Sequence, residues 1–350
     1  MVDWSLARQI ARFAAGSERM PDLGLDLAGL ARRLEPEVAA HTGLVLSAPA
    51  PPVELLRRAE WAEVNLQTLA PMLDPVSARL DQRLGTAGRL AGPLRVTAGA
   101  TVAAEFGLVM GYVSTRVLGQ YEVSLLGPEV APRLLFIPAN LEKAIHELNV
   151  DRESFLGWIV IHELTHCFQF QGVGWLREHV RGLVREYLQT VEVRIERGAA
   201  ATIPSLLDLG KLVEAFREGG LAGLVQTGEQ RRLMRRMQAT MAVIEGYSEH
   251  IMDALGPHLL RSYGGLREAM DRRRASRSAP ERIIARLLGL DLKLRQYELG
   301  KRFCDAVAEL GGTAALNRVW TGPEALPSLA ELSRPAEWLA RVERGAPAAA

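Results

Sequence analysis

One segment constrains the fold of this chain more than any other. WIVIHELTHCFQF, residues 158 to 170, sets two histidines and a glutamate into an otherwise largely apolar run. On a helix its apolar side chains would occupy almost every direction around the axis, and a helix that is apolar on all sides is buried. Burying an uncompensated carboxylate costs several kcal/mol, which a metal ion and its water would offset. The segment therefore predicts a core helix that carries a polar site.

The histidines in this segment have the spacing of metal ligands. His162 and His166 are four residues apart, so on a helix their side chains share one face at a separation of about 6 Å. That arrangement suits a tetrahedral zinc ion, and Glu163, about 60° around the helix from His166, can reach a water on the metal without being a ligand. HELTH is the HExxH motif of zinc hydrolases, in which the glutamate is the general base. The competing interpretation is a pair of hydrogen-bonded core histidines beside a surface glutamate.

A third ligand must come from elsewhere in the chain. The extended motif HExxHxxGxxH fails, because Gln169 and Gly172 stand at its glycine and final histidine positions. A distant acid or His179 must serve, and the best candidate lies in MAVIEGYSEHIMDALGP, residues 241 to 257, which has the pattern of a helix end. Glu245 shares a stripe of this helix with methionines and a serine, so it interrupts a mostly apolar face and needs a partner. We predict that zinc is that partner.

Glu249 follows Glu245 by one helical turn. It is predicted to accept a hydrogen bond from the distal nitrogen of a zinc-bound histidine, a contact that fixes the orientation of the ring. The competing assignment makes Glu249 the ligand and Asp253 its supporting residue, since the spacing of four repeats. Glu245 is preferred because its stripe indicates burial and because Gly246 would allow this helix and the HExxH helix to approach closely. A di-iron site is disfavoured, since the Glu-x-x-His pair of such helical bundles occurs once in this chain.

Periodicity along the chain predicts a mostly α protein of the α+β class. Helical spacing of apolar residues covers residues 3–15, 24–41 and 53–84. Two β-prone runs, at 121–126 and 133–138, flank a segment with a glycine and two prolines and are predicted to pair as a hairpin. The second run lies shortly upstream of the HExxH motif, where zinc peptidases commonly place the strand that pairs with substrate.

The domain organisation is predicted to be simple. Residues 1–92 form a helical N-terminal region and residues 93–345 form the catalytic region, within one integrated domain. In the second region, Asn140 and Asp151 are predicted to cap two consecutive helices, and a further helix is predicted to begin near Thr227.

Composition disfavours several classes of partner. With 42 Lys+Arg against 41 Asp+Glu in 350 residues, the chain has no overall field to attract nucleic acid or an anionic membrane. The N-terminus lacks the features of a signal peptide, and two cysteines allow one disulfide at most, so a reduced, cytoplasmic protein is predicted. From Val96 to Thr115 the only charge is Glu105, with Gly107 and Gly111 at GxxxG spacing. We predict a buried helix packed through its glycines there, not a membrane span.

Seven motifs in order along nearly the whole chain carry a family resemblance. They are VDW, VLGQYEV, HELTHCFQFQGVGWLREH, EGYSEHIMDALGP, LRQYELGKRF, ALNRVW and PAEWLARV. They resemble a zincin-like family labelled as associated with biosynthesis of the deazaflavin coenzyme. The resemblance implies a mostly helical, zincin-like metallohydrolase core with a small hairpin or sheet. EGYSE is also similar to the EGxAE segment of gluzincin peptidases, whose first glutamate binds zinc, and this supports Glu245 as a ligand.

These features predict a zinc-dependent hydrolase, a peptidase or amidase acting on a peptide or amide substrate. Zinc held by the two histidines and Glu245 lowers the pKa of its water, and Glu163 takes the proton as the water attacks a carbonyl. Both histidines must be neutral to bind, so zinc loss is expected below about pH 6. The oxyanion needs a further donor, and Tyr297 is preferred because its helix has many polar residues. The other candidates are Tyr247, His250 and Arg295. The competing class is a non-catalytic zincin-like protein that binds a metal or ligand.

Overall fold

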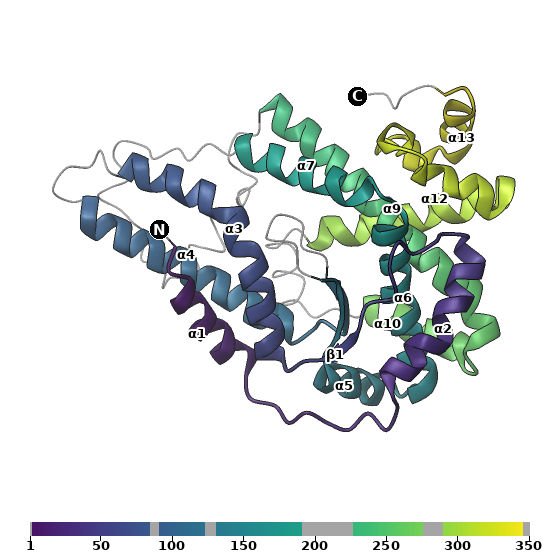
Figure 1. The fold of residues 1–350 in the computed structure, drawn as a ribbon, viewed down its shortest axis with the longest axis horizontal. Helices are drawn as coiled ribbons and strands as arrows, with labels where there is room; N and C mark the ends of the chain where they lie inside the picture. Colours follow the sequence, from purple (N-terminus) through teal and green to yellow (C-terminus); the bar gives the residue numbers. More distant parts are fainter. Residues whose placement is uncertain (1, 85–90, 123–130, 191–226, 276–289, 346–350) are drawn as a thin grey trace.

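The fold is mostly helical with one small sheet, as predicted (Figure 1). The computed structural model describes residues 2–84, 91–122, 131–190, 227–275 and 290–345. The strands are β1 (Val53–Leu55), β2 (Gly119–Glu122) and β3 (Arg133–Phe136). The α-helices are α1 (Trp4–Ala15), α2 (Leu27–Thr42), α3 (Arg58–Leu84), α4 (Ala91–Ser114), α5 (Pro138–Leu148), α6 (Arg152–Gly172), α7 (Leu176–Thr190), α9 (Gly228–Leu259), α10 (Tyr263–Ala275), α12 (Leu290–Leu316) and α13 (Pro335–Glu343).

The three-stranded sheet has the order β1-β3-β2. β2 pairs antiparallel with β3, which confirms that the two β-prone runs pair; residues 123–130 between them lie outside the described residues. β3 is the central strand, so the strand predicted to pair with substrate already has a neighbour on each side. The strand at the edge that contacts the HExxH helix α6 is β2 instead.

The prediction of one helix over residues 53–84 was wrong at its start. Val53–Leu55 forms β1, parallel to β3, and α3 begins at Arg58. The N–H of Leu134 in β3 donates to the carbonyl of Pro52 at 2.9 Å, so the pairing already begins at the residue before β1. Pairing with the central strand therefore overrides the helical pattern of these residues.

Two of the three predicted helix starts are confirmed. Asp151 accepts a hydrogen bond from an amide in the first turn of α6, and Thr227 forms a capping box at the start of α9. Asn140 is not a cap, because α5 begins before it. Its side-chain amide donates to the carbonyls of Ser114 and Val117, at 2.7 and 2.6 Å. Asn140 therefore satisfies carbonyls at the end of α4 instead of amides at the start of a helix.

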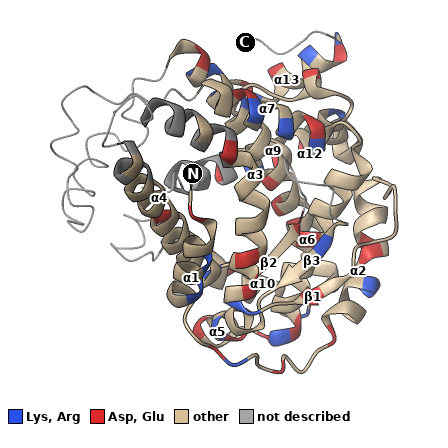
Figure 2. Ribbon diagram, turned by 60° about the vertical axis from the view of Figure 1, so that its left-hand side comes forward, with Lys and Arg blue, Asp and Glu red and all other residues tan. Residues whose placement is uncertain are grey.

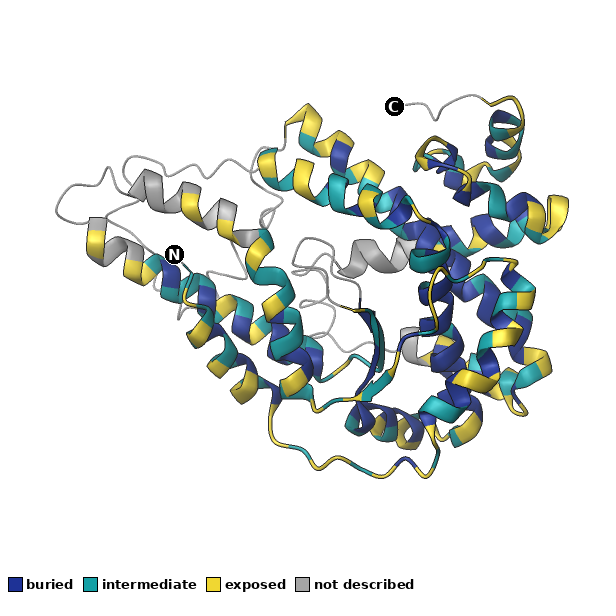
Figure 3. Cartoon of the chain, viewed as in Figure 1, coloured by how far each residue is buried: buried dark blue, intermediate teal, exposed yellow. Residues whose placement is uncertain are grey.

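Two apolar clusters share the central strand. Leu134 and Phe136 pack in the larger cluster with residues of α2, α6 and α9, whereas Leu135 and the following Ile137 pack with residues of α1, α3 and α4. Side chains alternate between the faces of a strand, so β3 contributes to both clusters. Figure 3 shows α6 as one of the most buried helices, which confirms the predicted core helix. The boundary at residues 92 and 93 stays a prediction.

α4 packs on α1 through the predicted glycines. A Cβ atom at Gly107 would lie 2.6 Å from the carbonyl oxygen of Ala7, and one at Gly111 would lie 2.5 Å from the Cβ of Ala14. The helix is less buried than predicted. Only 28% of the residues in its apolar segment, which lies within Val96–Ser114, are buried. By length and composition alone this helix is able to cross a membrane. That the protein has no membrane partner stays a prediction.

Charges of both signs are mixed over the described residues. Figure 2 shows Lys and Arg interspersed with Asp and Glu along the helices. Ion pairs join the two signs between elements, as between Arg12 and Glu63 or between Arg33 and Glu153. The mixture agrees with the near-equal totals of the whole chain, and the absence of a nucleic-acid partner stays a prediction.

Gly246 and Gly300 lie where α9 crosses α12. A Cβ atom at Gly246 would lie 2.2 Å from the carbonyl carbon of Gly300, and one at Gly300 would lie 1.9 Å from the carbonyl oxygen of Ala242. The close approach at Gly246 is therefore to α12, whereas the sequence predicted a close approach to the HExxH helix α6. This crossing fixes the part of α9 that carries Glu245.

Replacing Gly300 with alanine is expected to lower the free energy of unfolding by about 3 kcal/mol, because the added methyl group meets backbone that only a helix movement can shift. Gly182→Ala is the matched control, since its site in α7 has open space. It should be neutral or raise stability by up to about 1 kcal/mol through helix propensity. Urea unfolding followed by circular dichroism measures both variants. Equal stability of the two would mean that α9 and α12 do not cross at these glycines.

Candidate metal centre

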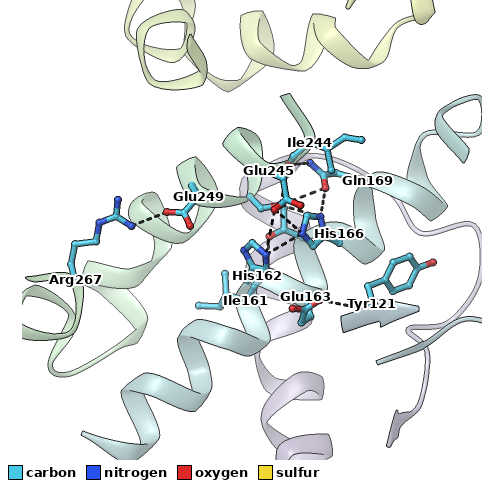
Figure 4. Close-up of polar contacts among 12 residues, drawn as sticks. Tyr121, Ile161, His162, Glu163, His166, Gln169, Ile244, Glu245, Glu249 and Arg267 are labelled. Atoms are coloured by element: carbon cyan, nitrogen blue, oxygen red, sulfur yellow. Dashed lines mark hydrogen bonds and ion pairs between the residues drawn. The ribbon is translucent and has the colours of Figure 1, made fainter. Parts of the chain in front are cut away.

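α6 and α9 pack together and turn three side chains toward one another (Figure 4). The Nε2 atoms of His162 and His166 are 3.1 Å apart. Glu245 Oε2 lies 3.8 Å from the first of these nitrogens and 3.6 Å from the second. Within the part of the chain that the structure describes, these three residues form the one group of His, Cys, Asp or Glu side chains whose geometry could hold a metal ion.

The three donor atoms fit a single metal ion. Two ligand atoms bound to a tetrahedral zinc ion at about 2.0–2.1 Å are about 3.3–3.4 Å apart, and the separations here are close to that value. Two histidines and a glutamate are also the donor set of catalytic zinc sites that keep a fourth position open. The side chains of His162, His166 and Glu245 are 21%, 12% and 11% exposed, so water can reach the site.

The two histidines differ in their electrostatic surroundings. Burial lowers the pKa of His162, and the neighbouring His166 lowers it further. Burial also acts to lower the pKa of His166, but its contact with the Glu245 carboxylate outweighs burial and raises the pKa to about 9. A cation that binds at Nε2 of His166 must therefore displace a proton at neutral pH.

Zinc binding at neutral pH is expected to release about one proton from His166. The proton competes with the metal for Nε2, so zinc affinity should fall about tenfold per pH unit as the pH decreases below the raised pKa. The onset of zinc weakening thus lies at higher pH than the sequence alone suggests. Calorimetric titrations in buffers of different ionisation enthalpy count the protons, and a titration above the His166 pKa is the control. A zinc affinity that is flat from that pKa to neutral pH would contradict this result.

Strand β2 holds Glu163 beside the ligands. Its Oε2 accepts a hydrogen bond from the backbone N–H of Tyr121 at 2.7 Å, and the residue is only 6% exposed. A Cβ atom at Gly119 would lie 3.0 Å from Cγ and 3.1 Å from Oε1 of Glu163, so this glycine lets the strand approach the carboxylate. Glu163 therefore has a fixed position next to the three ligand side chains without being one of them (Figure 4).

Glu249 does not make the predicted contact with a histidine. Its Oε2 accepts a hydrogen bond from Arg267 Nη1 of α10 at 2.9 Å, because a buried carboxylate is stabilised by a cation that reaches it. The distal nitrogen of His166 faces Gln169 Oε1 at 2.8 Å. The distal nitrogen of His162 has no hydrogen-bond partner among the described residues. The supporting contact thus comes from Gln169.

The group of three does not include His179, the alternative ligand, or Asp253, the supporting residue of the competing assignment. Asp253 forms ion pairs with Lys301 at 2.8 Å and with Arg267 at 3.3 Å. His179 lies on α7, where its ring packs edge-on against Trp175. Glu245 is the acid that the structure brings to the two histidines, and its role as a zinc ligand stays a proposal.

The candidate oxyanion donors have other contacts. Tyr247 is buried, and its hydroxyl donates to Asn317 Oδ1 at 2.8 Å. His250 Nδ1 lies 2.8 Å from Asp305 Oδ1. The other two candidates, Arg295 and the preferred Tyr297, lie on α12. Their side chains are outside the described part of the structure. The role of Tyr297 therefore stays a prediction.

Two contacts of the site are missing from the predictions made from the sequence. Gln169 entered only as the residue that breaks the extended zinc motif, although its position three residues after His166 places it on the same helix face. That spacing was a usable signal. The N–H group of Tyr121 carries no such signal, because its contact with Glu163 depends on where a separate strand packs.

The fold and the site together define a class of protein. The chain is mostly helical, and its HExxH helix and a glutamate from a second helix form a candidate metal centre of the zincin type. The chain belongs to the zincin-like metallopeptidase family, whose sequence model matches residues 2–339. It is similar to a solved structure from Chloroflexus aurantiacus that is described as a candidate hydrolase with a novel fold. The two share 29% identity over 98% of this chain and 99% of the other, with a TM-score of 0.70. No curated protein matches.

Proposed function

We propose that the protein is a zinc-dependent hydrolase of peptide or amide bonds. The observation that carries this proposal is the convergence of His162, His166 and Glu245 beside a buried Glu163. The two Nε2 atoms and the carboxylate of Glu245 would hold the metal, which makes the site a gluzincin-type one. When bound there, zinc supplies a Lewis acid that polarises a carbonyl and lowers the pKa of a water to about 7.

Glu163 is the general base in this proposal. Because its Oε2 accepts the Tyr121 N–H, Oε1 is left to take a proton from the attacking water and to pass it to the leaving nitrogen. Burial limits the access of bulk water to this carboxylate, so the proton stays within the site. Of the two edge strands β1 and β2, β2 contacts the HExxH helix α6, so it is the strand proposed to lie beside an extended substrate.

Metal content and hydrolysis measured on the same purified protein test this function. We expect about one zinc ion per chain, loss of peptide or amide hydrolysis on chelation, and recovery when zinc is restored. Bound zinc without zinc-dependent hydrolysis of any member of a peptide and amide library would favour the non-catalytic role. Protein that binds no zinc would reject the metal site itself.

The substrate and the cellular setting are predictions from the sequence. Cys167 and Cys304 are buried and form no disulfide, which agrees with the proposed reduced, cytoplasmic setting. The link to biosynthesis of the deazaflavin coenzyme rests on the family resemblance alone. No step of the proposed reaction depends on it.

A further inference from the structure

We infer that Gln169 is a positioning residue that fixes both the ring of His166 and the helix that carries Glu245; this inference rests on the proposed metal site. Gln169 lies on α6 three residues after His166, on the face that carries the histidines, and its exposed fraction is 0%. A fully buried glutamine needs a partner at each end of its amide. The partners it has are both parts of the site.

Each end of the Gln169 amide makes a hydrogen bond. Nε2 donates to the backbone carbonyl of Ile244 in α9 at 2.8 Å, and Oε1 lies 2.8 Å from Nδ1 of His166. A carbonyl oxygen only accepts, so the contact with Ile244 assigns the NH2 group to that side. The oxygen of the amide then faces the ring and must accept a hydrogen bond from it. His166 therefore carries a proton on Nδ1.

This proton position decides what the other ring nitrogen can do. Nε2 of His166 is the atom that lies 3.1 Å from His162 Nε2 and 3.6 Å from Glu245 Oε2. With Nδ1 protonated, a neutral ring presents the lone pair of Nε2 to this group of donor atoms. In the opposite tautomer an N–H would point into the group and exclude a cation. Gln169 thus selects the tautomer that binds metal.

The same side chain also fixes the second ligand helix. Ile244 directly precedes Glu245, so the bond from Gln169 ties α9 to α6 at the point where the third ligand projects. Ser248 adds to this arrangement, because its hydroxyl donates to the Ile244 carbonyl at 3.2 Å and lies 3.3 Å from Nδ1 of His166. One buried amide therefore sets the position of two of the three ligands.

Two substitutions separate the two hydrogen bonds. Gln169→Leu removes both hydrogen bonds and keeps a side chain of similar size. Gln169→Glu keeps an acceptor for His166 and loses the donor to Ile244. We expect zinc affinity, measured by competition with a chromophoric chelator, to fall by about 10–100-fold in the leucine variant and by less in the glutamate variant. Gln171→Leu is the matched control, since Gln171 lies on the same helix and contacts Cys167 Sγ instead of a ligand. Its zinc affinity should equal that of the wild type.

Nitrogen NMR of histidine-labelled, metal-free protein above the His166 pKa gives a readout that a merely structural role would not move, because no metal fixes the tautomer there. We expect the His166 proton on Nδ1 in the wild type and a shift toward Nε2 in Gln169→Leu. A proton on Nε2, or equal zinc affinity of the wild type and Gln169→Leu, would overturn the role of Gln169 and leave the proposed function standing. Wild-type protein that binds no zinc would overturn both. If the leucine variant does not fold, the wild-type spectrum still decides.

Discussion

Glu163→Gln is expected to lower the rate of hydrolysis by about 100- to 10,000-fold and to leave the bound zinc unchanged. The glutamine oxygen can still accept the Tyr121 N–H, so the side chain keeps its place and loses only its ability to take a proton. The rate is measured with zinc in excess, and the zinc content by elemental analysis of the same sample. Glu153→Gln is the matched control, since Glu153 lies in the first turn of α6 and pairs with Arg33 at the surface. It should hydrolyse at the wild-type rate.

Two other results would change the role of Glu163. A wild-type rate in Glu163→Gln would remove this residue from the mechanism. Loss of zinc together with loss of rate would mean that Glu163 supports metal binding, so that the rate alone is not diagnostic. Retained zinc with lost hydrolysis is the combination that a general base requires.

The HExxH helix is predictable from the sequence because its determinants are local. Asp151 caps the helix, its apolar side chains surround the axis, and the spacing of His162 and His166 places both rings on one face. Glu245 is less directly predictable, since it lies far along the chain on another helix. Its apolar stripe still indicates burial, whereas the adjacent Gly246 packs against α12 and not against the helix that carries the histidines. These signals lead to the three side chains that the structure brings together.

Contacts that depend on a third element do not follow from local patterns. Residues 53–55 have a helical pattern, yet they pair with β3. Glu249 binds Arg267 because α10 packs against α9, and no periodicity in the sequence indicates that pair. Asn140 has the local signal of a cap, but carbonyls at the end of α4 take its amide. Local signals place the ligand-bearing helices, whereas tertiary packing decides what the other polar side chains bind.

Glu245→Gln is expected to lower zinc affinity by at least about 100-fold, because a neutral amide replaces the anionic ligand. This loss of affinity is larger than the loss that is typical when a supporting residue is replaced. The carboxylate oxygen that it removes lies 3.6 and 3.8 Å from the two histidine nitrogens. Glu249→Gln is the matched change one turn later in α9. Its amide oxygen can still accept from Arg267, so its zinc affinity should remain that of the wild type. Chelator competition measures both variants.

The same two variants separate the competing ligand assignments. Loss of zinc in Glu249→Gln but not in Glu245→Gln would make Glu249 the ligand, which requires α9 to shift by one turn, about 5.4 Å, relative to α6. Glu245 also raises the pKa of His166, so the zinc binding that remains in Glu245→Gln should depend less steeply on pH. A Glu245→Gln variant with wild-type affinity and wild-type pH dependence would reject Glu245 both as a ligand and as the partner of His166.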